Sequence, residues 1–157
     1  MNFLITWKKL IMIDEKLYDS IKKLSPNAKF PAPFVENLNL KITKFIRGHC
    51  EATIIVSDNW TNPYGIAHGG FLFTILDEIL GSACCSMLSD KVYSDMVDLS
   101  TTNHDIFFHS PASPGDKLFI NGKVTSSRKN MIFVEGNIKN INKDLIAESK
   151  GIWFVKR

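Results

Sequence analysis

The feature that most restricts the fold of this 157-residue chain is the segment that follows Gly69 and Gly70. Its apolar residues recur at helical spacing and cover almost the whole circumference of a helix: Leu72, Ile75, Leu76, Ile79, Leu80, Ala83, Cys84, Met87 and Leu88. A helix that is apolar nearly all round must be buried on most sides, so the rest of the chain has to surround it.

Segments of strand-like composition lie on both sides of this helix in the sequence. Residues 38–57 predict two strands joined by a turn at Arg47-Gly48, and residues 94–109, 117–126, 131–141 and 145–156 predict four more. Asn121-Gly122 falls within strand periodicity and fits a bulge better than a hairpin tip. Consecutive strands with short connections are antiparallel. The predicted architecture is therefore α+β, with a curved antiparallel sheet wrapped around one long central helix.

The first 35 residues form a separate stretch of different character. Apolar spacing predicts helix over residues 3–24, in two pieces around Ile13-Asp14, with Asp14 as the cap of the second piece. Pro31 and Pro33 indicate an extended connector. We expect a helical extension over residues 1–35 and a single domain over residues 36–157.

Charge and cysteine content exclude several classes of protein. The net charge is +3, and no run of five like charges occurs, so a nucleic-acid partner is not indicated. Cys50, Cys84 and Cys85 are odd in number and lack a disulfide or zinc spacing, so we expect buried thiols in a reducing compartment.

The chain is also not predicted to insert into a membrane. Its most apolar stretch is interrupted near the centre by Asp77 and Glu78, and Lys8 and Lys9 interrupt the apolar N-terminus. We expect a cytoplasmic protein, with a mitochondrial or plastid location as the alternatives.

Polar residues that could take part in catalysis lie near the start of the central helix. Two glycines before a helix leave backbone N–H groups exposed at its positive end, where they attract oxygen atoms that develop negative charge. His68 is placed to brace this turn, and Asn62 offers an amide in the preceding loop. Asp77 is costly to bury on an apolar helix unless it has a role or a partner. Each residue alone also fits a structural role, and it is the combination that favours a functional site.

The combination resembles the hotdog-fold thioesterases of the phenylacetate-pathway and acyl-CoA thioesterase 13-like group. Their pattern is an Asn, a His-Gly-Gly six residues later, and an Asp seven residues after the second Gly. Asn62, His68-Gly69-Gly70 and Asp77 match it without departure. Ser110-Pro111 followed by Gly115-Asp116 also resembles the turn of that family, and the similarity extends over residues 41–157.

This resemblance implies hydrolysis of an acyl-CoA thioester to a free acid and CoA, without a cofactor or metal. The Gly69 N–H would bind the thioester carbonyl oxygen, assisted by Asn62, and Asp77 of another subunit would act as base or nucleophile. Thr101 would position the water, with Ser100 and Thr102 as alternatives if the strand register shifts. The family also implies a homodimer or a dimer of dimers.

The substrate-binding predictions concern both ends of the acyl-CoA. His68 and Gly70 would support the carbonyl site, and Arg128, Lys129 and Asn130 form either a solvated turn or a contact for the CoA phosphates. Aromatic residues near the motif would line a pocket for a medium or long acyl chain, or an aryl group: Tyr64, Phe71, Phe73, Phe107 and Phe108.

Two further chemistries were weighed against these residues. His104 and His109 are five residues apart on a predicted strand and should face opposite sides, so a shared metal is not expected. Glu78 projects about 100° away from Asp77 around the helix and is not expected to share its role. The alternatives to a thioesterase are a non-catalytic acyl-CoA binder and a hotdog dehydratase. The acyl chain, and the choice between CoA and a carrier protein, stay open.

Overall fold

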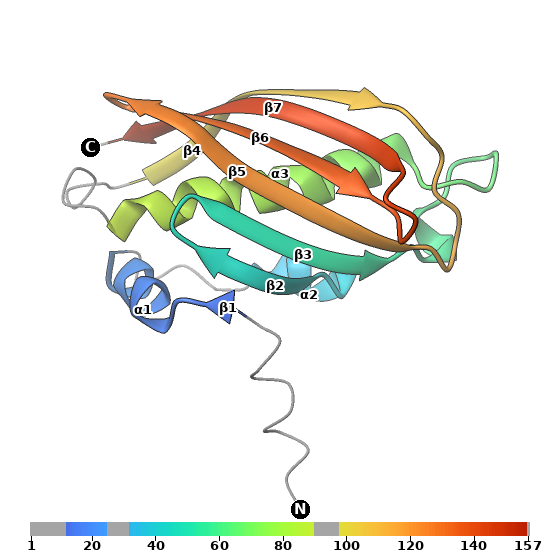
Figure 1. Cartoon of the computed structure of the whole chain (residues 1–157), viewed down its shortest axis with the longest axis horizontal. Coiled ribbons are helices and arrows are strands. Elements are labelled where there is room, and N and C mark those ends of the chain that lie inside the picture. Colours follow the sequence, from blue (N-terminus) through green and yellow to red (C-terminus); the bar gives the residue numbers. More distant parts are fainter. Residues whose placement is uncertain (1–11, 25–31, 90–97, 157) are drawn as a thin grey trace, which may run out of the picture.

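The chain folds into one sheet that curves around one long helix (Figure 1). The computed structural model describes residues 12–24, 32–89 and 98–156. The sheet strands are β1 (Met12–Ile13), β2 (Lys41–Ile46), β3 (His49–Ile55), β4 (Asp98–Phe108), β5 (Lys117–Arg128), β6 (Met131–Lys139) and β7 (Leu145–Lys156). They are arranged in the order β1-β2-β3-β5-β6-β7-β4, and every pair is antiparallel except β1 with β2. This order makes β4 an edge strand.

The central helix α3 (Gly69–Cys85) continues into a short 3₁₀ turn (Ser86–Ser89), as the sequence predicts. Its apolar side chains are buried under the sheet, and Ile75, Leu76 and Leu80 are completely enclosed. Gly122 of β5 permits this close packing, because a Cβ at that position would lie 2.9 Å from the carbonyl oxygen of Ile79. Asn121-Gly122 is therefore part of a regular strand, and the bulge of β5 falls instead between Val124 and Ser126.

Length and composition alone would also allow this helix to cross a membrane. The candidate segment is Gly69–Leu88, with a mean hydropathy of 1.6, but 56% of it is buried inside the fold. The sheet supplies the apolar surroundings that the helix needs, which is the behaviour of a core helix.

The N-terminal residues differ from their predicted structure in two places. Met12–Ile13 is a strand parallel to β2 rather than helix, while residues 3–11 lie outside the described part. Helix α1 (Glu15–Leu24) begins as expected, since the Leu17 N–H donates to the Asp14 carboxylate at 3.1 Å. Pro33 starts a further helix, α2 (Pro33–Leu38), instead of continuing a connector. Proline suits the first turn of a helix because the missing N–H would have no partner there.

The extension packs into the same core as the central helix. Leu17 and Ile21 of α1 and Val35 of α2 are buried in one cluster with residues of the sheet and α3. In Figure 1, α1 and α2 lie beside β2, at the lower border of the sheet. The extension therefore closes one side of the space between β2 and α3.

The predicted thiols and the remaining strands agree with the structure. The strands at 98–108, 117–128, 131–139 and 145–156 overlap the predicted segments. Cys50 and Cys84 are buried and Cys85 is partly buried, all as free thiols. Burial raises the pKa of Cys50 to about 12 and that of Cys85 to about 11, so both are protonated at neutral pH.

Candidate active site

The loop that precedes α3 is fixed by the side chain of Asn62. Its Oδ1 accepts hydrogen bonds from the N–H groups of Tyr64 at 2.9 Å and Ile66 at 3.4 Å. The Asn62 N–H in turn donates to the Ile66 carbonyl at 2.8 Å. Within the described residues its Nδ2 group has no partner, so this amide remains available as a donor.

The first turn of α3 presents one backbone donor that the fold does not use. His68 caps the helix, because its Nδ1 accepts the Gly70 N–H at 2.9 Å. Among the described residues, no group accepts a hydrogen bond from the Gly69 N–H. Phe108 covers Gly69 so closely that a Cβ there would lie 3.3 Å from its ring. Glycine therefore leaves room at an N–H that lies at the positive end of the helix.

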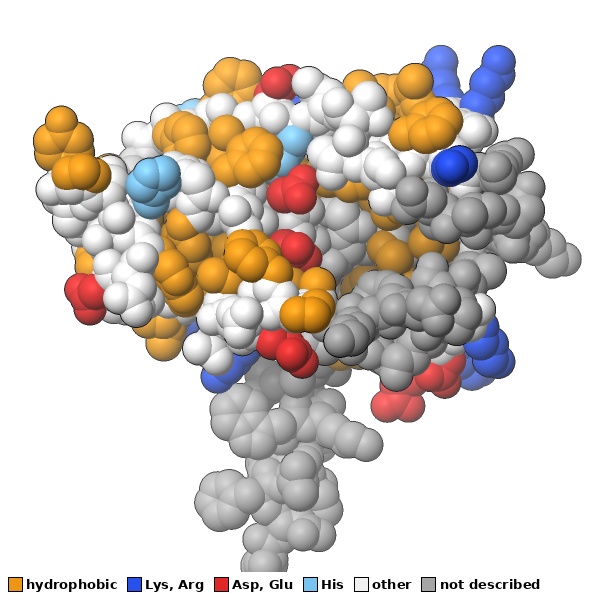
Figure 2. Space-filling model, turned by 180° about the vertical axis from the view of Figure 1, so that it is seen from behind, with side chains coloured by type: hydrophobic (Ala, Val, Ile, Leu, Met, Phe, Trp, Pro, Cys, Tyr) orange, Lys and Arg blue, Asp and Glu red, His pale blue; other side chains and the backbone are white. Residues whose placement is uncertain are grey.

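Asp77 lies in the middle of α3 and reaches the N-terminal half of β4. The Thr101 hydroxyl donates to Asp77 Oδ1 at 3.3 Å, and His104 Nδ1 lies 3.3 Å from the same oxygen. The Asp77 side chain is 39% exposed, whereas that of His104 is 2% exposed. Figure 2, which views the molecule from behind, shows acidic and histidine side chains among hydrophobic ones across its middle.

An irregularity in β4 explains why Thr101 and His104 both reach Asp77. Residues three apart on a regular strand face opposite sides of the sheet. The register of β4 against β7 shifts between Thr101 and Asn103, which places both side chains toward α3. Sequence reasoning considered His104 only together with His109 and so missed its contact with Asp77. His109 pairs with Glu148 at 3.2 Å.

The structure does not bring Gly69 and Asp77 together within one chain. They are eight residues apart on one straight helix, which corresponds to about 12 Å along its axis. A thioester carbonyl that accepts the Gly69 N–H is therefore too far from Asp77 of the same chain for reaction.

The basic turn is also remote from Gly69. Arg128 and Lys129 are exposed at the β5–β6 turn, which the register places at the same end of the sheet as Ser100.

The predicted aromatic pocket is not formed by one chain. Phe71 is buried against Trp60, with ring centroids 4.8 Å apart, while Phe73 packs against His104 at 4.3 Å. Tyr64 and Phe107 are exposed, and Phe108 is exposed beside Gly69. The rings lie on different faces of the sheet and of α3, so some are buried and others are exposed to solvent.

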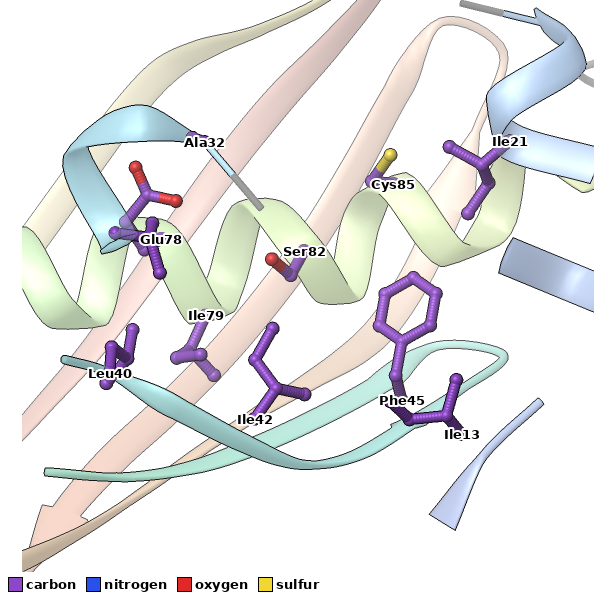
Figure 3. Close-up of a pocket in the computed structure, with 11 residues that line it drawn as sticks. Ile13, Ile21, Ala32, Leu40, Ile42, Phe45, Glu78, Ile79, Ser82 and Cys85 are labelled. Atoms are coloured by element: carbon purple, nitrogen blue, oxygen red, sulfur yellow. The ribbon is translucent and has the colours of Figure 1, made fainter. Parts of the chain in front are cut away.

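An apolar cavity of about 330 Å³ lies instead between α3, β2 and the N-terminal extension. Figure 3 shows Ile42 and Phe45 of β2 pointing toward Ser82 and Cys85 of α3, with Ile21 at one end. Glu78, the neighbour of Asp77 in the sequence, lies at the other end near Ala32. Burial, and then the charge of Asp77, raise the pKa of the Glu78 carboxyl.

The arrangement of donors and carboxylates contains no obvious metal site. Across the described ranges 12–24, 32–89 and 98–156, no three His, Cys, Asp or Glu side chains gather closely enough to hold a metal ion. The chemistry available to these residues is proton transfer, nucleophilic attack by a carboxylate and stabilisation of an oxyanion.

Comparison with known proteins identifies the family. The model of the thioesterase superfamily matches residues 64–147, which is more than half of the chain. The chain belongs to the thioesterase superfamily. A protein of Saccharolobus solfataricus that carries an esterase name is 26% identical over 88% of this chain and 94% of its own length. The predicted hotdog fold and the assignment as a thioester hydrolase are confirmed.

Solved structures of similar proteins have the same fold. The smu.793 protein of Streptococcus mutans, solved with acetyl-CoA, is 29% identical with a TM-score of 0.68, over 75% of this chain and 89% of that one. A Streptococcus pneumoniae thioesterase, solved with coenzyme A, is 27% identical with the same TM-score and coverage. The PaaI protein of Escherichia coli has a TM-score of 0.75 at 20% identity, covering 91% of this chain and 95% of that one.

Proposed function

We propose that this thioesterase hydrolyses acyl-CoA thioesters to a free acid and CoA. The observation that carries the proposal is the presence on one helix of an unpartnered N–H at Gly69 and a partly exposed carboxylate at Asp77. Binding of CoA and acetyl-CoA by two similar proteins supports CoA as the carrier. The positively charged turn at Arg128, Lys129 and Asn130 is the proposed contact for the CoA phosphates.

The proposed reaction divides between two chains. The Gly69 N–H and the Asn62 amide of one chain hold the carbonyl oxygen, and Asp77 of a second copy faces the carbonyl carbon from the other side. Asp77 removes the proton from a water that Thr101 positions, and the new C–O bond moves an electron pair onto the carbonyl oxygen. When the carbonyl reforms, the C–S bond breaks and the CoA sulfur leaves with the proton. In the alternative, the Asp77 carboxylate attacks the carbonyl carbon directly and expels the CoA thiolate. Water then hydrolyses the resulting anhydride to the free acid and regenerates the carboxylate.

The edge strand β4 is the proposed contact between the two copies. It offers eleven residues of backbone along the free side of the sheet. Exposed strand edges favour pairing with another chain. Phe73, Phe107 and Phe108 add exposed apolar surface on β4 and α3. This pairing is expected to give a homodimer, which could assemble further into a dimer of dimers.

A mixing experiment tests the shared site. Asp77→Asn and Asn62→Asp chains are each impaired in a different half of the site. After they are unfolded together and refolded, half of the dimers contain one intact site, so about a quarter of wild-type activity returns. If each chain contained a whole site, the mixture would show no more activity than its separate components. Single-turnover hydrolysis in ¹⁸O-water then tests the nucleophilic role, since label enters the Asp77 carboxylate only if an anhydride forms and water attacks it at the Asp77 carbonyl.

We further propose that the acyl chain occupies the cavity beside Glu78. Its lining is almost entirely apolar, and its volume of about 330 Å³ lies in the range of small-molecule pockets. At roughly 30 Å³ for each small group, which is the share of one water molecule in the liquid, it holds about eleven such groups. The expected preference is therefore a medium-length chain. A panel of acyl-CoA esters from acetyl to palmitoyl, including phenylacetyl, tests this by thiol release.

Ser82→Phe provides the matched variant for that panel. The new ring would fill part of the cavity and should lower kcat/KM for octanoyl-CoA and decanoyl-CoA much more than for acetyl-CoA. An equal loss for all chains, or no loss, would place the acyl group elsewhere. Binding of acyl-CoA without thiol release from any ester would instead support a non-catalytic binder.

A further inference from the structure

His104 is buried in surroundings that do not favour a histidine. Its side chain is 2% exposed and packs between Phe73, at a centroid distance of 4.3 Å, and Trp153, at 5.8 Å. Neither ring nitrogen makes a hydrogen bond with any described residue. A buried polar group without a hydrogen bond destabilises the fold, and an apolar side chain would fill the same space without that penalty.

Among the described residues, the ring forms an ion-pair contact with the proposed catalytic carboxylate. Nδ1 lies 3.3 Å from Asp77 Oδ1, which is within the range of an ion pair although the alignment is not that of a hydrogen bond. Thr101 donates to the same oxygen at 3.3 Å. Hydrogen bonds of active sites are often long in the unliganded enzyme and tighten when substrate is bound. The Asp77 side chain is 39% exposed here, so substrate and a second chain would enclose it further.

We infer that His104 is a positioning residue for Asp77. Its Nδ1 and the Thr101 hydroxyl both lie 3.3 Å from Oδ1. When the site closes around substrate, a small rotation would align the Nδ1–H with that oxygen and leave Oδ2 for the substrate. The nitrogen nearest a carboxylate must carry a proton to interact favourably with it, so the required form is protonated at Nδ1. The bulge between Thr101 and Asn103 is the structural device that brings both donors to one oxygen. The inference rests on the proposed role of Asp77.

Three substitutions separate positioning from packing. His104→Leu keeps an apolar side chain between Phe73 and Trp153 but removes the donor. His104→Asn places an amide N–H near the position of Nδ1, whereas His104→Gln places it near Nε2. Loss of a hydrogen bond to a charged group should lower kcat about 10- to 100-fold in the leucine variant, with KM little changed. The asparagine variant should recover most of kcat, and the glutamine variant should not.

The stability of the same variants gives an independent prediction. His104→Leu removes two buried ring nitrogens that lack partners, so its melting temperature should equal or exceed that of the wild type. His49→Leu is the matched control, because His49 also lies close to a carboxylate, Glu51, at 3.0 Å. It projects from the face of β3 opposite to the buried Cys50, away from α3, and should leave kcat unchanged.

The outcomes distinguish this inference from the proposed function. A His104→Leu variant with wild-type kcat, or a His104→Asn variant as impaired as His104→Leu, would overturn the positioning role. If the leucine variant melts far below the wild type, the comparison rests on the folded asparagine and glutamine variants. Equal kcat values in these two would then give His104 a structural role, whereas a higher kcat in the asparagine variant would support positioning. If Asp77→Asn also retains wild-type activity, the proposed role of Asp77 fails. If only Asp77→Asn is inactive, that role stands and the inference about His104 fails alone.

Discussion

Replacement of Asp77 by asparagine tests the proposed chemistry most directly. The amide has nearly the same shape as the carboxylate, and its oxygen can still accept the hydrogen bond from Thr101. Asparagine can neither take a proton from water nor form an acyl anhydride. A positioned base typically contributes roughly 10²–10⁴ to the rate, so kcat should fall by about that factor.

The expected effect on stability is much smaller. The Thr101 hydroxyl is 3.3 Å from Asp77 Oδ1, and the carboxylate is 39% exposed to solvent. Hydrogen bonds and ion pairs of partly exposed groups contribute about 1 kcal/mol or less. The free energy of unfolding should therefore change by no more than about 1 kcal/mol in either direction.

Three measurements on one preparation check these expectations: thiol release, titration with a non-hydrolysable acyl-CoA analogue, and thermal unfolding. Glu51→Gln is the matched control, since the Glu51 side chain is 36% exposed and also contacts a histidine. It lies on β3 rather than on α3 and should change neither rate nor binding. More than about a tenth of the wild-type rate in Asp77→Asn would contradict the reasoning and point to Glu78 as the base. Loss of a cooperative thermal unfolding transition would mean that Asp77 is required for folding.

The remaining predictions concern the loop, the core and the thiols. Asn62→Asp keeps the oxygen that orders the loop but removes the amide donor, so kcat should fall about 10²- to 10³-fold with a nearly unchanged melting temperature. A much lower melting temperature together with the lower kcat would make Asn62 structural. Gly122→Ala should lower the free energy of unfolding by about 1–3 kcal/mol in urea titrations, because its Cβ would press on the Ile79 carbonyl; an unchanged midpoint would contradict this packing. Burial raises the pKa of Cys85 to about 11, so iodoacetamide at pH 8 should label the folded chain far more slowly than the urea-unfolded chain, as followed by mass spectrometry; equal rates would show that the thiol is accessible.

Sequence periodicity was sufficient for the elements whose burial pattern is local. The all-round apolar pattern of α3 and the alternating pattern of the strands are consequences of where each side chain points, so both are visible in the sequence. The cap at Asp14 is equally local, because it depends on a bond to the backbone three residues away.

The elements that were missed depend on partners far away in the chain. The strand at Met12–Ile13 exists because it pairs with β2, and its two residues carry no pattern of their own. The sequence predicts an extended connector at Pro33, although proline is equally suited to begin a helix. The contact of His104 with Asp77 depends on a single extra residue in β4, and a shift of one residue reverses the face of every side chain that follows.

The geometry of α3 connects the family assignment to the proposed second chain. A buried apolar helix has few positions where polar groups are tolerated: its first turn, where N–H groups lack partners, and points where a side chain reaches the surface. Two such positions in α3 are Gly69 and Asp77, about 12 Å apart along the axis. One helix cannot bring both to one carbonyl, but two helices related by a twofold axis can place the first turn of each beside the middle of the other. Each helix would then serve two sites, as a donor in one and as a base in the other. On this arrangement, the separation between Gly69 and Asp77 determines how far the two helices are offset.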